Sequence, residues 1–173
     1  MITIEHELGN PFSQDFYDKL ISSIQFHQLS CTCGHCACLI RHGAYLRTVK
    51  VGDSLLRLRV CRVRCTHCGS THALLPSAII PYSQILLADA AAILECHQQQ
   101  HSFSPFLECH LPIDENNIKS LISRYRRHWH QRLLAQGIRL LPLSMLVRRC
   151  FRFFSRQFLQ IKNTKNLLFS PPT

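Results

Sequence analysis

The sequence predicts an α+β protein in which a small β-hairpin precedes an all-α segment. Two runs rich in alternating β-branched residues, 39–51 and 55–65, flank the tripeptide Gly-Asp-Ser at 52–54, which suits a hairpin turn. Closely spaced cysteines stand at both outer ends of these runs. Farther along, between residues 86 and 136, apolar residues recur at helical spacing. These three observations place a cysteine-bearing hairpin ahead of a group of helices.

In the predicted hairpin strands, residues of the two faces alternate with period two, except at one point. Leu56, Leu58 and Val60 share one face, and the residues between them share the other. The phase then slips near Val60 and Cys61, which predicts a β-bulge there.

Length and charge narrow the classes of partner. The chain has 173 residues, 46% of them hydrophobic, which is enough for one domain or two small ones with a real core. The formal net charge is +10, and it is unevenly placed: all ten acidic residues lie at or before Glu115, and twelve lysines and arginines follow it. An excess of this size favours a polyanionic partner, either nucleic acid or an acidic membrane surface.

The expected cellular compartment decides whether the ten cysteines are interpreted as disulfides or as metal ligands. The first ten residues contain an early pair of glutamates and no apolar run, so no secretory signal is expected. No run of about 18 apolar residues occurs, so no transmembrane helix is expected either. The predicted location is the cytoplasm, where disulfides are disfavoured and closely spaced cysteines indicate metal binding.

Two cysteine pairs carry the strongest signal in the chain. Cys65 and Cys68 are separated by two residues and followed by glycine, which allows a tight turn around one metal ion. Cys33 and Cys36 have the same spacing, and the 28 residues between the two pairs accommodate the hairpin. Four thiolates would surround one structural Zn²⁺ tetrahedrally. We therefore predict a zinc ribbon over residues 31–78.

The first cysteine pair leaves alternatives open. Cys31 and Cys38 are alternate ligands, and three histidines are weaker substitutes: His35, His42 and His67. A redox role for Cys65 and Cys68 would need a βαβ context rather than a hairpin. The remaining cysteines are expected to be buried free thiols: Cys61, Cys96, Cys109 and Cys150.

Helical spacing of apolar residues predicts helices on both sides of the zinc ribbon. Residues 1–30 are predicted to be an N-terminal helical lead-in, because apolar residues between Phe16 and Ile24 recur at helical spacing. Residues 79–137 contain an Ala-rich helix at 86–100, a short helix at 104–109 and a long helix at 114–136. One apolar stripe runs along the long helix, through Ile118, Leu121, Ile122, Tyr125, Trp129 and Leu133. We expect Trp129 to be buried against the Ala-rich helix.

Residues 138–173 are predicted to form a basic amphipathic C-terminal helix followed by a disordered tail. The expected apolar face of this helix lies within 146–161 and contains Leu146, Cys150, Phe153, Phe154, Phe158 and Ile161. Membrane association through this face is one interpretation. Such a stripe is more often protein core or an oligomer contact, so a membrane partner is not expected and a homo-oligomer remains open.

Two sequence runs resemble a known family. They are CLIRHGAYLRTVK, from residue 38, and LRLRVCRVRCTHCGSTHALLPSAIIPYSQI, from residue 56. Together they resemble the transposase-type zinc ribbon, and especially small bacterial transposase-like proteins of unknown function. The resemblance covers residues 31–90 and, more loosely, the helices to 137. It implies a zinc ribbon followed by a helix-turn-helix-like segment, although the crowded first cysteine group departs from the usual single pair. The matching positions are Arg41, His42, Gly43, Tyr45, Arg47, Arg62, Arg64, Cys65, Cys68, Gly69, Thr71, His72, Ala73, Leu74, Leu75, Pro76, Pro81 and Tyr82.

The basic residues suggest binding to double-stranded DNA. In a helix-turn-helix, the last helix lies in the major groove and its N-terminal residues reach base edges. Asn117 could pair with adenine, whereas the run at 124–128 suits phosphates. The candidate contacts are Arg57, Arg59, Arg62 and Arg64 on the ribbon and Asn117, Lys119, Arg124, Arg126 and Arg127 on the long helix. A solvated basic face on a packing helix is the alternative interpretation.

No enzymatic activity is expected. Transposase catalysis needs three carboxylates around metal ions, and no aspartate or glutamate follows Glu115. No phosphate-binding loop or hydrolase motif is present either. The sequence therefore predicts a zinc-stabilised DNA-binding protein that resembles the targeting region of a transposase. The alternative is a zinc-ribbon adaptor that binds protein and makes no contact with nucleic acid.

Overall fold

The structure, a computed structural model, describes residues 1–6, 12–109, 112–161 and 168–169. Its elements follow in chain order: β1 (Ile2–Ile4), α1 (Gln14–Ser23), the 3₁₀ turn η1 (Phe26–Gln28), β2 (Leu39–Val51), β3 (Ser54–Cys65), β4 (Thr71–Pro76), α2 (Leu87–Gln98), α3 (Ser104–Cys109), α4 (Glu115–His128), α5 (His130–Ala135), α6 (Leu143–Phe154) and β5 (Leu168–Phe169). The predicted α+β class is confirmed at this level.

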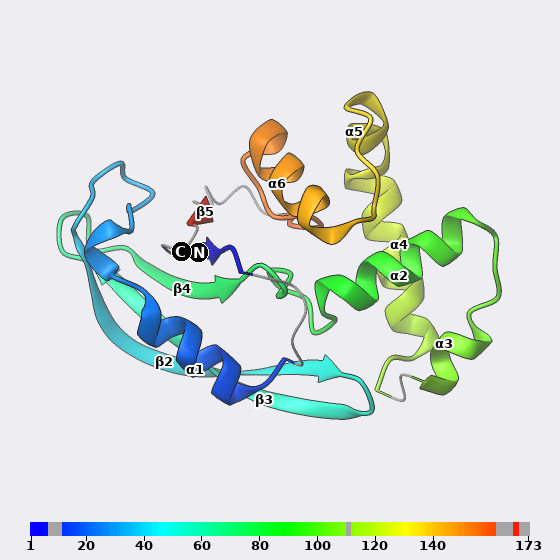
Figure 1. Cartoon of the computed structure of the whole chain (residues 1–173), viewed down its shortest axis with the longest axis horizontal. Helices are drawn as coiled ribbons and strands as arrows, with labels where there is room; N and C mark the ends of the chain where they lie inside the picture. Colours follow the sequence, from blue (N-terminus) through cyan, green and yellow to red (C-terminus); the bar gives the residue numbers. More distant parts are fainter. Residues whose placement is uncertain (7–11, 110–111, 162–167, 170–173) are drawn as a thin grey trace.

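The strands form one mixed sheet in the order β2-β3-β4-β1-β5 (Figure 1). β2 pairs antiparallel with β3, and β3 pairs antiparallel with β4. β1 lies parallel to both β4 and β5, with Ile2 opposite Leu74 and Thr3 opposite Leu168. The sheet is therefore larger than the predicted hairpin, because β4, β1 and β5 join it. The sequence analysis predicted a helical lead-in at 1–30, whereas residues 2–4 form a strand.

The β2–β3 hairpin occupies the predicted residues. Its register runs from Leu39 opposite Cys65 to Val51 opposite Ser54 at the turn. The irregularity lies on β2, between Arg41 and Gly43, rather than on β3 as predicted. A single extra residue in β2 shifts the pairing, so β3 can keep its alternation while parts of both its faces are buried.

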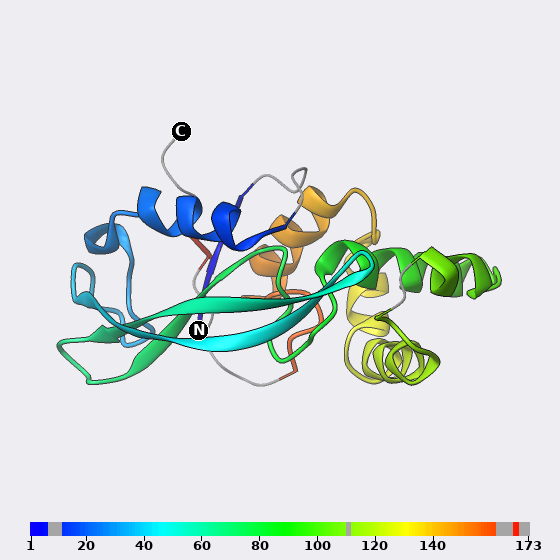
Figure 2. The ribbon, with the colours of Figure 1, turned by 90° about the horizontal axis from the view of Figure 1, so that it is seen from below.

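α1 covers one face of the sheet. Figure 2 shows the helix lying along the hairpin. Its N-cap is Ser13, whose hydroxyl accepts a hydrogen bond from the Phe16 amide at 3.1 Å. Tyr17 and Ile21 are buried, and they join a core with the inward residues of the sheet, such as Leu58 and Leu74. This sheet core is the first of two apolar clusters.

The second apolar cluster joins the helices. Residues of α2, α4, α5 and α6 pack together with the segment that follows α6. Trp129 is 1% exposed, and its ring meets those of Phe154 and Phe158 edge-on at 5.6 and 5.4 Å between centroids. The indole Nε1 donates to the Gln160 carbonyl at 3.3 Å. The expected burial of Trp129 is confirmed, but the rings it meets belong to the C-terminal segment.

Two helical predictions need correction. The predicted helix at 114–136 is interrupted at Trp129, whose φ and ψ of −126° and −34° divide it into α4 and α5. α6 ends at Phe154, so Phe158 and Ile161 of the predicted apolar face lie beyond the helix. Within α6, Val147 and Phe151 are buried, whereas Phe153 of that face is 43% exposed. The cause is tertiary packing against Trp129 and α2, which orients the helix differently from the predicted face. Part of the predicted disordered tail is ordered, because Leu168 and Phe169 form β5 and pair with β1. Residues 162–167 and 170–173 of that tail lie outside the described residues.

Among the described helices, none is both long enough and apolar enough to cross a membrane.

Candidate metal centre and basic face

Four thiols converge at the outer end of the hairpin. The sulfur atoms of Cys31, Cys33, Cys65 and Cys68 all lie within 4.8 Å of one another. The Cys31 and Cys68 sulfurs are 3.6 Å apart, and those of Cys33 and Cys65 are 3.9 Å apart. Cys31 and Cys65 are buried, while Cys33 and Cys68 reach solvent. This group could hold a metal ion.

Two short turns bring the thiols together. In the first, the Gly34 amide donates to the Cys31 carbonyl at 2.9 Å, and in the second, the Gly69 amide donates to the Cys65 carbonyl at 3.0 Å. Both glycines have positive φ, 94° and 73°, a conformation that residues with a Cβ rarely adopt. Each turn therefore wraps its chain around one pair of cysteines and ends on a glycine.

The structure brings together three of the four predicted metal ligands. Cys36 is outside the group, and its sulfur lies 3.0 Å from the Ser30 hydroxyl. Cys31, an alternate in the sequence analysis, takes its place. A signal for this choice exists in the sequence: glycine directly follows Cys33, as it follows Cys68, so Cys33 is the second cysteine of its turn and its partner lies upstream.

Cys38, the other alternate, lies beside the group. Its sulfur is 3.3 Å from that of Cys65, and it also donates to the His35 carbonyl at 3.2 Å. The chain around it joins the two turns, because the Thr66 amide donates to the Cys38 carbonyl at 2.8 Å. Cys38 thus links the turns while remaining outside the four-cysteine group.

The local hydrogen bonds favour thiolates in the second turn. The backbone amide of Cys68 donates to the Cys65 sulfur at 3.4 Å and lowers the pKa of Cys65 to about 6. Hydrogen bonds from Ser70 lower the pKa of Cys68 below its usual value. Burial instead raises the pKa of Cys31 to about 11. Because thiolates are the metal-binding form, the second turn is prepared for a cation.

Histidines surround the thiols without entering the group. The rings of His35 and His67, one from each turn, stack with centroids 3.5 Å apart. His72 on β4 places Nε2 3.3 Å from the Cys31 sulfur, and its Nδ1 lies 3.5 Å from the N-terminal amine. His42, the third predicted substitute ligand, lies on β2 at the bulge.

One family model matches the part of the chain that contains both turns and the hairpin. Residues 29–105 match the family model of a domain of unknown function, DUF6431. The match begins just before the first turn and ends within α3, so the four cysteines lie inside it and α4 lies beyond it. No curated protein and no solved structure matches the chain.

The candidate nucleic-acid contacts on the ribbon lie along β3. Arg57, Arg59 and Arg64 are exposed. Arg62 is half-buried, and its guanidinium donates to the Thr71 hydroxyl at 2.8 Å. Odd and even positions of a strand point to opposite faces, so these arginines do not form one surface.

The candidate contacts on α4 fall on two sides of the helix. Lys119, Arg126 and Arg127 line an open hollow of about 670 Å³ together with His97 and Phe103. All three basic residues are exposed, and Lys119 pairs with Glu115 at 3.0 Å one turn earlier. Burial lowers the pKa of His97, and the positive charges of Arg126 and His130 lower it further. This outer side of α4 therefore carries a positive potential.

Asn117 and Arg124 lie on the other side of α4, against the hairpin tip. They line a smaller hollow of about 140 Å³ with Lys50 of β2. The Asn117 side-chain oxygen accepts from the Asp114 amide in a capping box and also from Lys50 Nζ. Burial lowers the pKa of Arg124. The start of α4 is thus packed on the hairpin, and Asn117 completes the capping box with the N-cap residue Asp114.

Sequence reasoning missed the residues of the outer hollow that lie outside α4. His97 closes α2, and Phe103 precedes α3. Neither carries a motif, because their place beside α4 arises only when α2 packs on α4. A faint signal exists in the composition: the segment 97–103 holds histidines and an aromatic residue and no acidic one.

Proposed function

We propose that this chain is a zinc-stabilised protein without catalytic activity that binds duplex DNA through the outer side of α4. One Zn²⁺ per chain, held by Cys31, Cys33, Cys65 and Cys68, would be structural. Its role is to fix the two turns that close the outer end of the hairpin.

The sulfur spacing supports zinc. Zinc–sulfur bonds measure about 2.3 Å, so a regular tetrahedron of thiolates has edges of about 3.8 Å. The Cys31–Cys68 and Cys33–Cys65 separations of 3.6 and 3.9 Å lie on either side of that value. Four sulfur ligands also complete the coordination sphere and leave no position for a reacting water.

The observation that carries the DNA proposal is the basic hollow on α4. Three exposed cations and a histidine line it, and none of its described lining residues is a carboxylate. The aromatic ring of Phe103 lies among them. Proteins contact the DNA phosphate backbone through basic side chains. Lys119, Arg126 and Arg127 share one side of a helix, so they could contact phosphates together. The resemblance of residues 31–90 to transposase zinc ribbons agrees with a nucleic-acid partner.

The basic residues of α4 are expected to contact DNA phosphates rather than bases. The first turn of α4 packs on the hairpin, and Asn117 already accepts two hydrogen bonds within the chain. The exposed cations lie farther along the helix. We therefore expect affinity to come mainly from charge, with little selectivity contributed by Asn117.

A salt titration tests the proposal. Binding of the zinc-loaded chain to a mixed-sequence duplex should weaken with a log–log slope of about −0.9 per phosphate neutralised. The double variant Arg126→Ala with Arg127→Ala should bind every sequence more weakly, and its slope should be shallower by about one unit per lost contact.

The matched control removes the same charge elsewhere. Arg132 and Arg152 are exposed and line neither hollow of α4. Their double alanine variant should keep most of the affinity and the slope. Equal losses in both double variants would mean that net charge alone drives binding. No complex at micromolar concentrations and low salt, with folded and zinc-loaded protein, would overturn the DNA proposal and favour the adaptor.

A further inference from the structure

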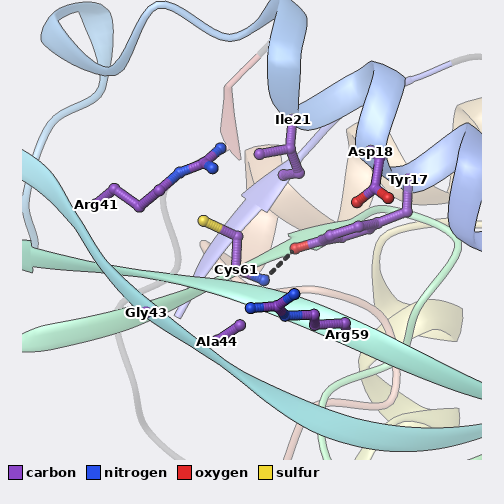
Figure 3. A pocket seen from close by; sticks show the side chains of 8 residues that line it. All are labelled: Tyr17, Asp18, Ile21, Arg41, Gly43, Ala44, Arg59 and Cys61. Carbon is purple, nitrogen blue, oxygen red and sulfur yellow. Dashed lines mark hydrogen bonds between the residues drawn. The ribbon is translucent and has the colours of Figure 1, made fainter.

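A further cavity lies between α1 and the hairpin and shares no lining residue with the four-thiol group or with the two hollows on α4. Its volume is about 290 Å³, and it is lined by Tyr17, Asp18, Ile21, Arg41, Arg59 and Cys61, together with the small residues at 43 and 44 (Figure 3). Figure 3 shows the side chains of Arg41 and Arg59 reaching into the space around Cys61 from opposite sides. Two cations from neighbouring strands thus share one cavity.

The wall of this cavity is fixed by hydrogen bonds. The Tyr17 hydroxyl accepts from the Cys61 amide at 2.7 Å and donates to the Leu74 carbonyl at 3.0 Å. Gln14 of α1 accepts from the Arg59 amide at 2.8 Å and donates to Asp18 at 2.9 Å. α1 is therefore tied to β3 at two points on either side of the opening, and the cavity is preformed.

Local structure also sets the position of Arg41. The β2 bulge lies between Arg41 and Gly43, and Gly43 has a φ of 131° with open space where a Cβ would stand. The Arg41 guanidinium rests over the Phe26 ring, 5.9 Å from its centroid. Bulges re-aim side chains and are common beside functional sites. Here the bulge and the aromatic ring hold the cation at the rim.

The charges of the cavity are unbalanced. Within the part of the chain that the structure describes, neither Arg41 nor Arg59 forms an ion pair. Asp18 is the single carboxylate of the lining, and it already accepts from Gln14. Burial raises the pKa of the Cys61 thiol, and the neighbouring Arg41 opposes that shift. Two guanidinium groups therefore face the cavity with only one carboxylate near them.

We propose that this cavity binds a small phosphomonoester, with its phosphoryl group between Arg41 and Arg59. Guanidinium groups match phosphoryl oxygens with paired N–H donors, and two of them balance a dianion. A cavity of about 290 Å³ lies at the lower end of the range for ligand sites, which favours a small organic phosphate. A hydroxyl of the same ligand would donate to Asp18, whose carboxylate can accept more than one hydrogen bond.

This inference is independent of the DNA proposal. Arg59 is one of the candidate DNA contacts of the sequence analysis, but Arg41 is not. The cavity shares no residue with the hollow on α4 through which DNA is proposed to bind. The Arg126→Ala, Arg127→Ala double variant should therefore keep phosphate binding. Arg41→Gln should leave the salt dependence of DNA binding unchanged. The phosphate titration and the DNA titration therefore give separate answers, so one proposal can fail while the other holds.

The test titrates the zinc-loaded full chain with inorganic phosphate and with glycerol phosphate, followed by calorimetry and by the NMR shift of the Cys61 amide. Saturable binding should shift that amide, and glycerol phosphate should bind more tightly. Arg41→Gln and Arg59→Gln should each weaken binding about tenfold or more. The control Arg132→Gln removes the same charge far from the cavity and should bind like the wild type.

A shape variant separates a built site from a charged surface. Ala44 is exposed and lines the cavity, so Ala44→Leu fills space without changing charge. It should abolish phosphate binding while the chain stays folded by circular dichroism. Binding that survives Ala44→Leu, or that falls equally in Arg132→Gln and Arg41→Gln, would overturn the proposal. So would the absence of saturation by either phosphate at millimolar concentrations.

Discussion

At the residue scale, Cys31 and Cys36, the two candidate partners of Cys33, have different surroundings. Cys31 is buried against the sulfur of Cys68, whereas Cys36 is exposed and contacts Ser30. Local spacing cannot separate them, since each forms a plausible pair with Cys33. The difference arises from the glycine that must end the turn, and from the hairpin that fixes which sulfurs meet.

This difference makes a direct prediction about metal content. Cys31→Ser should lower bound zinc well below one per chain, because a serine hydroxyl is a far poorer zinc ligand than a thiolate. Cys36→Ser should retain about one zinc per chain. Elemental analysis of both purified variants, after removal of free metal, measures this. Loss of zinc from Cys36→Ser with retention in Cys31→Ser would contradict the ligand set.

A second residue, Tyr17, joins α1 to two strands through one hydroxyl. Tyr17→Phe removes the acceptor for the Cys61 amide and the donor to the Leu74 carbonyl, and both backbone groups lie in buried surroundings. The free energy of unfolding should fall by about 1–3 kcal/mol. Denaturant titration measures the change.

The control for this prediction is Tyr45→Phe, which alters an exposed tyrosine on β2. It should change stability by less than about 0.5 kcal/mol. A Tyr17→Phe variant as stable as the wild type would show that the two hydrogen bonds contribute nothing net to folding.

At the scale of elements, local signals located the hairpin and the helices. The β2–β3 hairpin was predictable because alternation and the turn at 52–54 are local. Strand β1 was not, because its three residues gain their pairing from β4, some seventy positions away. A strand this short carries no periodicity of its own, and its partner is visible only in the folded sheet.

The break between α4 and α5 also escaped the sequence pattern. The apolar stripe continues through Trp129 to Leu133 without a proline or glycine to end the helix. The indole is instead held by two phenylalanine rings and the Gln160 carbonyl, all contributed by residues after 150. Such a contact between distant segments overrides a helical pattern that is locally complete.

Trp129 should accordingly be the main anchor of the helical cluster. Trp129→Ala removes a side chain that is 1% exposed and its contacts to Phe154 and Phe158. We expect a loss of about 3–5 kcal/mol in the free energy of unfolding. Calorimetric or denaturant unfolding provides the measurement.

Leu134, the control, lies five residues farther on and is 60% exposed. Leu134→Ala should cost less than about 0.5 kcal/mol. An indole that is freely quenched by solvent in the wild type would contradict the packing of Trp129 and the helical cluster built around it.

At the scale of the whole molecule, the hairpin separates two sites. Its twelve or thirteen residues per strand span about 40 Å, with the thiols at one end and the turn at the other. The turn end meets α4 through Lys50 and Asn117, and Arg47 donates to the Ile80 carbonyl behind it. A metal at the thiol end would therefore act on the basic hollow only through the rigidity of the strands.

This separation predicts a graded response to metal removal. The turns are held by backbone hydrogen bonds from Gly34, Thr66 and Gly69, and residues 33–37 and 66–70 are exposed. Chelation should therefore raise amide exchange at these three positions toward the rate of an unprotected chain. The helical cluster is buried around Trp129 and contains no thiol of the metal group, so the Leu133 amide, bonded to the Trp129 carbonyl at 2.9 Å, should keep its protection.

Hydrogen exchange followed by mass spectrometry, with and without a zinc chelator, distinguishes three outcomes. Loss of protection confined to 31–38 and 65–70 is the expected result, and it would show that zinc organises the turns alone. Unchanged protection there after complete removal of metal would mean that hydrogen bonds suffice to order the turns, and the structural role of zinc would be wrong. Loss of protection at both ends together would make the hairpin and the helices one cooperative unit. In that case a loss of DNA binding after metal removal would reflect unfolding of α4 rather than any contact made by the turns.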